Sequence, residues 1–337
     1  MRKIYLLLLL PLLSLLFINS DCHDNGISPP PIQGVQMTFV SSYTPQGNCS
    51  DSYLKNISGT DFAFLSTGNT GLEIVNVSNP ASPQFVSNFA VTGFTEEAYV
   101  SIINDVPYVF VAGGSGGLTI LNISNINAPV QDTILNFSGD YLNTVFVDEF
   151  NKILYTGGNN DNVHIVNLAN LPLVSNITTY QPYLNSFINE IQVRDNIAFI
   201  AQDGGLDIVN VSNPSTPVRL SHGISDDTAY DVKLSGNYAL VANNGNGVLV
   251  SNISNPSSPT ELSYLNTTGI GLACAVYGSL VYVAEDASGV EVFDISNPAY
   301  PNYIAYYSTL SYSENVNYYN GYLFVSDYNN FTVLRYP

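Results

Sequence analysis

One short phrase recurs seven times along the chain and limits its possible folds more than any other feature. The copies read GLEIVNVSNP from Gly71, GLTILNISNI from Gly117, NVHIVNLANL from Asn162, GLDIVNVSNP from Gly205, GVLVSNISNP from Gly247, GVEVFDISNP from Gly289 and a truncated FTVLRYP from Phe331. They begin 42 to 46 residues apart. A fixed period of this length indicates a series of similar supersecondary units that stack on their neighbours.

The repeat that begins at Arg219 predicts the structure of one unit. YDVKLSG alternates between apolar and polar residues, YALVA is almost continuously apolar, and GVLVSNIS ends at an Asn-Pro turn. Each segment is four to eight residues long and is bounded by Gly, Asn or Pro, as β-strands are. A more polar fourth strand, TELSYL, follows the turn. Four strands per unit are typical of a propeller blade.

The number of strands predicts how the ring closes. Seven third strands are present, but the last repeat stops without a fourth strand of its own. The segment from Met37 to Tyr43 has the fourth-strand pattern and precedes the first blade. The sequence therefore predicts an all-β, seven-bladed β-propeller with four antiparallel strands per blade, closed by pairing of the N-terminal strand with the last blade. The alternative, an open solenoid, requires polar caps at both ends.

These phrases, each preceded by a strand such as YVFVA, resemble the LVIVD-repeat family of bacteria and archaea. The resemblance covers about residues 36–337. Where the family phrase commonly carries Asp, this chain keeps it only at Asp294, and the other copies have Asn76, Asn122, Asn167, Asn210 and Asn252. The resemblance implies an extracytoplasmic seven-bladed propeller. It transfers no catalytic residue.

The numbers of acidic and basic residues limit the classes of partner that the chain can bind. The chain has 8 basic and 27 acidic residues, a net charge of −19. Nucleic-acid binding depends on Lys and Arg, so we expect no nucleic acid as a partner. The negative electrostatic field of such a chain favours binding of cations or basic partners. The alternative is that the charge only keeps the protein soluble. We expect a monomer whose partner is a protein or a polysaccharide.

The N-terminus predicts export. Arg2 and Lys3 precede a largely apolar run that ends at Ile18, the pattern of a signal peptide. We assign residues 1–21 to a signal peptide, 22–35 to a Pro-rich linker and 36–337 to the propeller. Two processing routes remain open: cleavage before Asp21 yields a soluble periplasmic or secreted protein, whereas lipidation of Cys22 yields a cell-envelope lipoprotein at the outer membrane or surface. The linker would then be a stiff tether.

Five carboxylates form the candidate site. We expect them at or just before the innermost strands, which ring the central channel: Asp51, Glu97, Glu190, Asp231 and Glu314. Oxygen ligands that converge there suit Ca²⁺, and the alternative is that they are solvated channel-wall residues. His23, His164 and His222 stand at unrelated repeat positions, which disfavours a shared histidine metal site. We expect no other cofactor.

Cys49 and Cys274 lie in early strands of different repeats. We expect buried thiols, although an oxidising compartment also permits a disulfide.

The chain has 24 Tyr and no Trp. Tyr is favoured at binding surfaces, but it also replaces Phe where blades meet. Two functions follow from these patterns: a non-catalytic scaffold that binds a partner through one propeller face, and a metal-dependent hydrolase or lactonase-like enzyme with an acidic axial site. The absence of any recognisable catalytic motif favours the scaffold.

The two N-terminal routes differ in the mass of the mature protein. Lipidation predicts a first residue Cys22 carrying acyl chains, and C22S then abolishes both the added mass and membrane association. Intact mass spectrometry of the protein from membrane and soluble fractions measures this. An unmodified chain beginning at Asp21 contradicts the lipoprotein assignment.

Overall fold

The computed structural model describes residues 36–182, 186–224, 227–243, 245, 247–287 and 289–336. The assigned signal peptide and the whole linker, including Cys22 and His23, lie outside these residues. Within them, no helix is long and apolar enough to cross a membrane.

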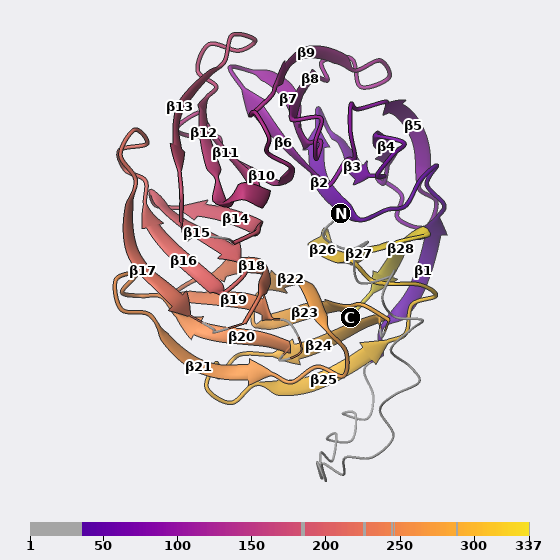
Figure 1. Ribbon diagram of the computed structural model, residues 1–337. Coiled ribbons are helices and arrows are strands. Elements are labelled where there is room, and N and C mark those ends of the chain that lie inside the picture. Colours follow the sequence, from indigo (N-terminus) through magenta and orange to yellow (C-terminus); the bar gives the residue numbers. More distant parts are fainter. Residues whose placement is uncertain are drawn as a thin grey trace, which may run out of the picture. The chain divides into compact units, whose positions relative to one another are not determined.

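Seven four-stranded antiparallel sheets are arranged in a ring (Figure 1). The innermost strands, one per blade, are β2 (Asp51–Ile57), β6 (Glu97–Ile103), β10 (Leu142–Asp148), β14 (Ile188–Arg194), β18 (Ala229–Ser235), β22 (Gly271–Tyr277) and β26 (Asn315–Tyr319). The second strands are β3 (Thr60–Ser66), β7 (Val106–Ala112), β11 (Ile153–Gly158), β15 (Ile197–Gln202), β19 (Tyr238–Asn243), β23 (Leu280–Glu285) and β27 (Tyr322–Asp327). The predicted propeller of seven blades is confirmed.

The third strands carry the recurring phrase and are β4 (Leu72–Asn76), β8 (Leu118–Asn122), β12 (Val163–Asn167), β16 (Gly205–Asn210), β20 (Gly247–Asn252), β24 (Gly289–Asp294) and β28 (Asn330–Arg335). The outer strands are β5 (Gln84–Phe89), β9 (Val130–Leu135), β13 (Ser175–Tyr180), β17 (Val218–Ile224), β21 (Thr260–Leu265), β25 (Asn302–Tyr307) and β1 (Thr38–Tyr43). A short 3₁₀ helix, η1 (Asn159–Asp161), joins β11 to β12, where the sequence pattern indicated only a turn.

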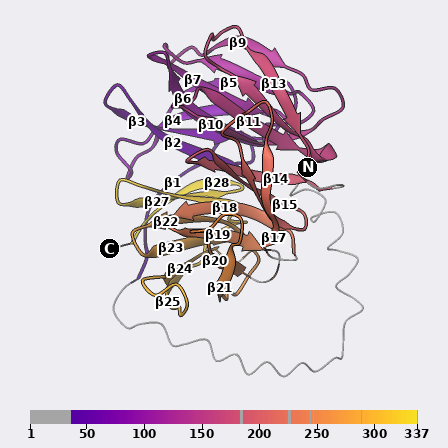
Figure 2. The ribbon, with the colours of Figure 1, turned by 90° about the vertical axis from the view of Figure 1, so that its left-hand side faces the viewer.

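The ring closes as predicted. β1 pairs with β28, with Thr38 opposite Arg335 and Tyr43 opposite Phe331. A register shift between Phe39 and Ser41 has a counterpart where the third and outer strands pair in each of the other six blades. β1 therefore behaves as the true fourth strand of the seventh blade, although it is the first strand of the chain. Figure 2 shows β1 and β28 together from the side.

The hydrophobic core consists of seven clusters, one between each pair of neighbouring blades. Alternate residues of a strand enter different clusters because successive strand side chains point to opposite faces of the sheet. Ile74 thus packs between blades 1 and 2, and Val75 packs between blades 7 and 1. This explains why the second and third strands are apolar on both faces.

The phrase begins and ends with turn chemistry. Gly71 has φ +97°, and a Cβ there would lie 2.2 Å from the carbonyl oxygen of Phe89. At the other end, the Asn76 side-chain oxygen accepts a hydrogen bond from the Ser78 N–H at 2.9 Å. Asp294 accepts the same bond from Ser296 at 2.8 Å. Asn and Asp are interchangeable in this turn, so the departure from the family's Asp leaves the turn intact.

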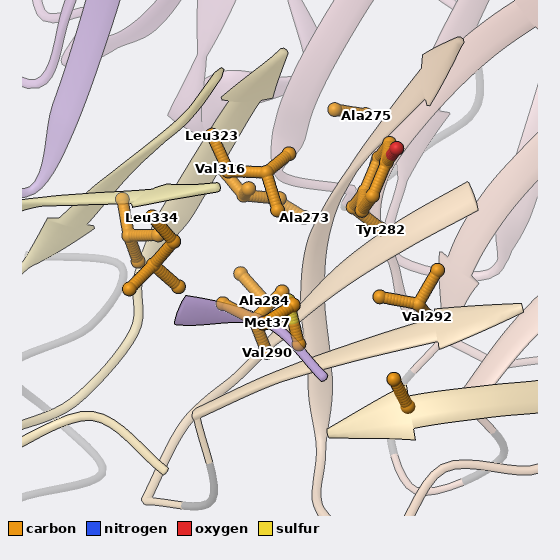
Figure 3. Close-up of a cluster of buried hydrophobic side chains, with 12 residues drawn as sticks. Met37, Ala273, Ala275, Tyr282, Ala284, Val290, Val292, Val316, Leu323 and Leu334 are labelled. Carbon is orange, nitrogen blue, oxygen red and sulfur yellow. The ribbon is translucent and has the colours of Figure 1, made fainter. Parts of the chain in front are cut away.

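Met37 anchors the closing strand. It lies among Ala284, Val290 and Leu334 in the cluster between blades 6 and 7 (Figure 3) and is 5% exposed, whereas Phe39 is 54% exposed. We expect M37A to lower the free energy of unfolding by about 2–4 kcal/mol because it leaves a cavity in the core. F39A, its control on the same segment, is expected to cost less than about 1 kcal/mol. Chemical denaturation measures both, and equal losses would contradict the anchoring role of Met37.

Candidate functional site

The five predicted carboxylates all lie at one end of the central channel. Neighbouring inner strands contact one another around the ring, and we call the face where these strands begin the mouth face. It also carries the connections between blades and the turns between second and third strands.

The strand register places four of these carboxylates at one blade position and the fifth one residue before it. Asp51, Glu97, Glu190 and Asp231 occupy the same position in their blades, opposite Ser66, Ala112, Ala201 and Ala242, respectively. Glu314 lies one residue before the corresponding position, where Asn315 pairs with Ser326. The acids therefore recur at one blade position, which Thr144, Ala273 and Asn315 fill in the other three blades.

Two of these acids bind the next blade. Glu97 accepts a hydrogen bond at 3.1 Å from the backbone N–H of Val145. Asp231 accepts one at 2.8 Å from the backbone N–H of Cys274. In both cases a side chain of one inner strand satisfies the backbone of the next. The carboxylates thereby join adjacent blades near the axis.

Lys233 neutralises part of the acidic ring. Its ammonium lies 2.8 Å from Asp231 Oδ1 and 3.5 Å from Glu190 Oε1. Burial lowers the pKa of this ammonium, but Asp231 and Glu190 outweigh burial and raise it well above the usual value. Lys233 therefore remains charged and links two of the acids.

The pKa of Glu97 is strongly perturbed. Burial, followed by the charges of Glu190 and Asp51, raises the pKa of Glu97 well above its usual value. Glu97, Glu190 and Asp51 thus share one electrostatic environment. Glu314 is not among the groups that shift the Glu97 pKa.

The described residues contain no group of three or more His, Cys, Asp or Glu side chains that could hold a metal ion. Calcium at the mouth stays a prediction.

Aromatic rings lie two residues further along the inner strands of blades 1 to 3. The ring centroids of Tyr53 and Tyr99 are 4.6 Å apart, and those of Tyr99 and Phe146 are 5.2 Å apart. They pack side by side across three blades. Gln192 and Lys233 occupy the same level in blades 4 and 5.

The two cysteines of the propeller, Cys49 and Cys274, are buried thiols, as predicted. Burial, with the Asp231 carboxylate next in effect, raises the pKa of the Cys274 thiol well above its usual value. The thiol therefore packs as a small apolar group.

A second set of polar groups was missed by the sequence analysis. It lies at the third position of the phrase, next to the mouth face, and differs between blades: Glu73, Thr119, His164, Asp207, Glu291 and Thr332. In blade 5 the apolar Leu249 fills this position. Sequence alignment of the copies reveals this variability. The partners, however, come from connections and outer strands with no common pattern.

The carboxylates and the imidazole at this position bind different partners. Glu73 accepts hydrogen bonds from the Tyr43 hydroxyl and, at 2.9 Å, from the Gln46 N–H. Asp207 binds the His222 imidazole, and its Oδ2 lies 3.3 Å from Arg219 Nε.

The interface between blades 5 and 6 holds two buried carboxyl groups, Glu285 and Glu291. The Thr268 hydroxyl oxygen lies 3.2 Å from Glu285 Oε2 and 3.0 Å from Glu291 Oε1, and the Gly269 N–H donates to Glu285 at 2.8 Å. Burial, with the hydrogen bond and charge of Glu291 next, raises the pKa of Glu285 to about 9. Glu285 is therefore protonated at neutral pH.

Tyrosines concentrate between blades 6 and 7, where Tyr282, Tyr318 and Tyr336 pack together. Tyr277 stacks on Tyr318 with a centroid distance of 4.0 Å and is 57% exposed. Much of the tyrosine excess thus serves blade packing.

Charge is distributed unequally over the propeller. Sixteen described acids lie in the connections and strand ends of the mouth face: Asp51, Glu73, Glu96, Glu97, Asp140, Asp161, Glu190, Asp203, Asp207, Asp227, Asp231, Glu285, Asp286, Glu291, Glu314 and Asp327. Eight described acids lie elsewhere: Asp61, Asp105, Asp132, Asp148, Glu149, Asp195, Glu261 and Asp294. None of the six described Lys and Arg residues lies in a mouth-face connection or turn.

Comparison with known proteins identifies the repeat. The LVIVD repeat model matches residues 56–91, 106–136, 189–221, 227–267 and 270–309. The copies that begin at Asn162 and Phe331 depart most from the phrase, and neither lies within a matched segment.

No curated protein matches the sequence. Among solved structures, Raptor of Chaetomium thermophilum is similar, with a TM-score of 0.69 and 12% sequence identity over 90% of this chain. The chain spans 29% of that protein, and the likeness shows the fold alone.

The Glu285 carboxyl predicts a pH dependence of stability. The pKa of Glu285 is higher in the folded state than in the unfolded chain. The stabilisation that its protonation gives the fold is therefore complete below about pH 4.5 and is lost as the pH rises through about 9. We expect E285Q to be more stable than the wild type at pH 8 by at least about 1 kcal/mol and to show a flatter profile. Thermal denaturation between about pH 6 and pH 9 measures this.

E261Q is the control, because Glu261 is an exposed residue of β21. If E285Q and E261Q give the same profile, the assignment of a raised pKa to Glu285 is wrong.

Proposed function

Because the chain belongs to the LVIVD-repeat family and folds as a seven-bladed propeller, we propose that it is a non-catalytic binding scaffold whose mouth face docks a basic protein. The unequal distribution of charge carries this proposal. Sixteen described acids lie in the connections and strand ends of the mouth face, whereas no described Lys or Arg lies in a connection or turn there. Lys233 and Arg219 reach Asp231 and Asp207 from within strands. Such a field accelerates and orients the approach of a positively charged surface.

The inner acids support a scaffold. Glu97 and Asp231 accept backbone hydrogen bonds from the next blade, and Lys233 contacts both Asp231 and Glu190. These contacts use the axial carboxylates to hold the blades together. None of these contacts favours the hydrolase alternative.

The connections of the mouth face lie where a partner would contact them. The blade cores remain nearly constant, while the mouth-face connections differ in length and composition. Binding specificity concentrates in such connections on a rigid framework. We further propose that the scaffold acts outside the cytoplasm, through the N-terminal signal pattern and anchoring at Cys22.

Poly-L-lysine tests the charge on the mouth face. We expect the purified protein to bind immobilised poly-L-lysine, more weakly at about 500 mM than at about 50 mM salt, and to bind neither poly-L-glutamate nor dextran. The triple variant D203N/D227N/D286N removes three mouth-face charges, and D105N/E149Q/D195N removes three from turns at the opposite face. The first should weaken binding about fivefold relative to the second, from roughly 0.3 kcal/mol per exposed charge.

The two triple variants have equal net charge, so a nonspecific attraction would weaken equally in both. That result would refute the assignment of the binding face. Preferential binding to dextran would identify a polysaccharide partner and overturn the basic-protein proposal.

A further inference from the structure

A cavity of about 340 Å³ opens between blades 2 and 3 on the mouth face. It is lined by the turn between β7 and β8, the connection between β9 and β10, and Asn159. Its volume is within the range of small-ligand sites. None of its lining residues is Lys or Arg.

Glycines shape one wall of this cavity. In the turn between β7 and β8, Gly114 has φ +56°, and a Cβ there would lie 2.7 Å from the Tyr141 ring. A Cβ on Gly116 would lie 1.7 Å from the carbonyl oxygen of Thr92. The turn can therefore approach both neighbours only without side chains at these positions. Backbone bonds between Gly114 and Leu142, at 3.1 and 3.2 Å, hold it there.

The opposite wall presents an aromatic ring whose position is fixed from behind. Phe137 stacks on the His164 imidazole, with centroids 3.8 Å apart and planes 10° apart. His164 Nε2 lies 2.6 Å from Asp140 Oδ2, and Nδ1 lies 3.0 Å from the Thr179 hydroxyl. A carboxylate only accepts, so Nε2 carries the proton and Nδ1 accepts from Thr179. Phe137 is thus held by a fully hydrogen-bonded side chain.

The walls of this cavity are negative. Burial lowers the pKa of His164 despite the opposing effect of Asp140, so the imidazole is neutral at neutral pH and leaves the Asp140 charge in place. Asn160 and Asn162 donate to that carboxylate at 3.0 and 3.1 Å without neutralising it. A second acid, Glu96, accepts a hydrogen bond from the hydroxyl of Tyr141 on the adjoining wall.

An aromatic ring beside a carboxylate, in a cavity without basic residues, matches a cation. Ammonium and guanidinium groups are attracted both to the face of an aromatic ring and to a nearby carboxylate. Anions are repelled by Asp140 and by the acids around the mouth. We propose that this cavity receives a lysine or arginine side chain, with its charged group against Phe137 and beside Asp140. This inference rests on the proposed function and identifies the anchor point of the basic partner.

Ligand-observed NMR with small probes tests the cavity directly. We expect N-acetyl-L-lysine amide and N-acetyl-L-arginine amide to bind the purified protein, and N-acetyl-L-norleucine amide, which has a similar stem without the charge, not to bind. F137L should weaken lysine amide binding about fivefold or more, because it removes the aromatic face. F187L makes the same substitution at a ring that is 52% exposed before blade 4 and should leave binding unchanged.

S115W is a second variant, independent of the Phe137–His164 stack. Ser115 lies on the cavity wall and is exposed, so the indole should block the cavity and abolish lysine amide binding. Melting temperatures of F137L and S115W within a few degrees of the wild type show that the fold is kept. Equal binding of the norleucine probe, preferential binding of cellobiose, or equal effects of F137L and F187L would each overturn the cation site.

Binding to poly-L-lysine separates this inference from the proposed function. If F137L binds poly-L-lysine as the wild type does while D203N/D227N/D286N does not, the basic partner stands and the anchor is wrong. If the wild type binds lysine amide in the cavity but ignores poly-L-lysine, the proposed function is wrong and the cavity binds small cations only.

Discussion

The packing of one blade against the next is the interaction on which this structure depends. A four-stranded sheet with apolar residues on both faces cannot bury them alone, and each blade covers one face of each neighbour. The phrase serves both contacts at once, since Ile74 enters one interblade cluster and Val75 the next. Every copy must therefore stay apolar at successive positions. This requirement keeps seven copies alike after the rest of each repeat has diverged.

Polar variation is tolerated where that packing ends. The third position of the phrase lies at the rim of each interface and carries Glu73, His164, Asp207 and Glu291 in four different blades. Each has a partner of its own: His164 binds Asp140 of a connection, whereas Asp207 binds His222 of the outer strand β17. The interfaces share apolar interiors and differ at their mouth-face ends. A ligand-binding function can therefore diverge there at little cost to the fold.

Periodicity was sufficient to predict the blades, the strand order and the closure by residues 37–43, because these depend on patterns within one repeat. It also placed Asp51, Glu97, Glu190 and Asp231 at one channel level. It could not predict that Glu97 and Asp231 bind backbone N–H groups of the next blade, because that depends on the orientation of side chains between blades. The Glu285–Glu291 pair and the cavity beside Phe137 were missed for the same reason. Their residues come from different repeats and meet only through the ring.

The pairing of β1 with β28 also has a consequence for how the molecule is made. Thr38 and its partner Arg335 are 297 positions apart, so the first strand to be synthesised pairs with the last. Until the C-terminus is available, the preceding blades form an open arc with an unpaired strand at one end and an uncovered sheet face at the other. Such contacts between distant residues form slowly, and exposed strand edges promote aggregation. Ring closure is therefore a late step of folding, and the open arc is most prone to aggregation before it.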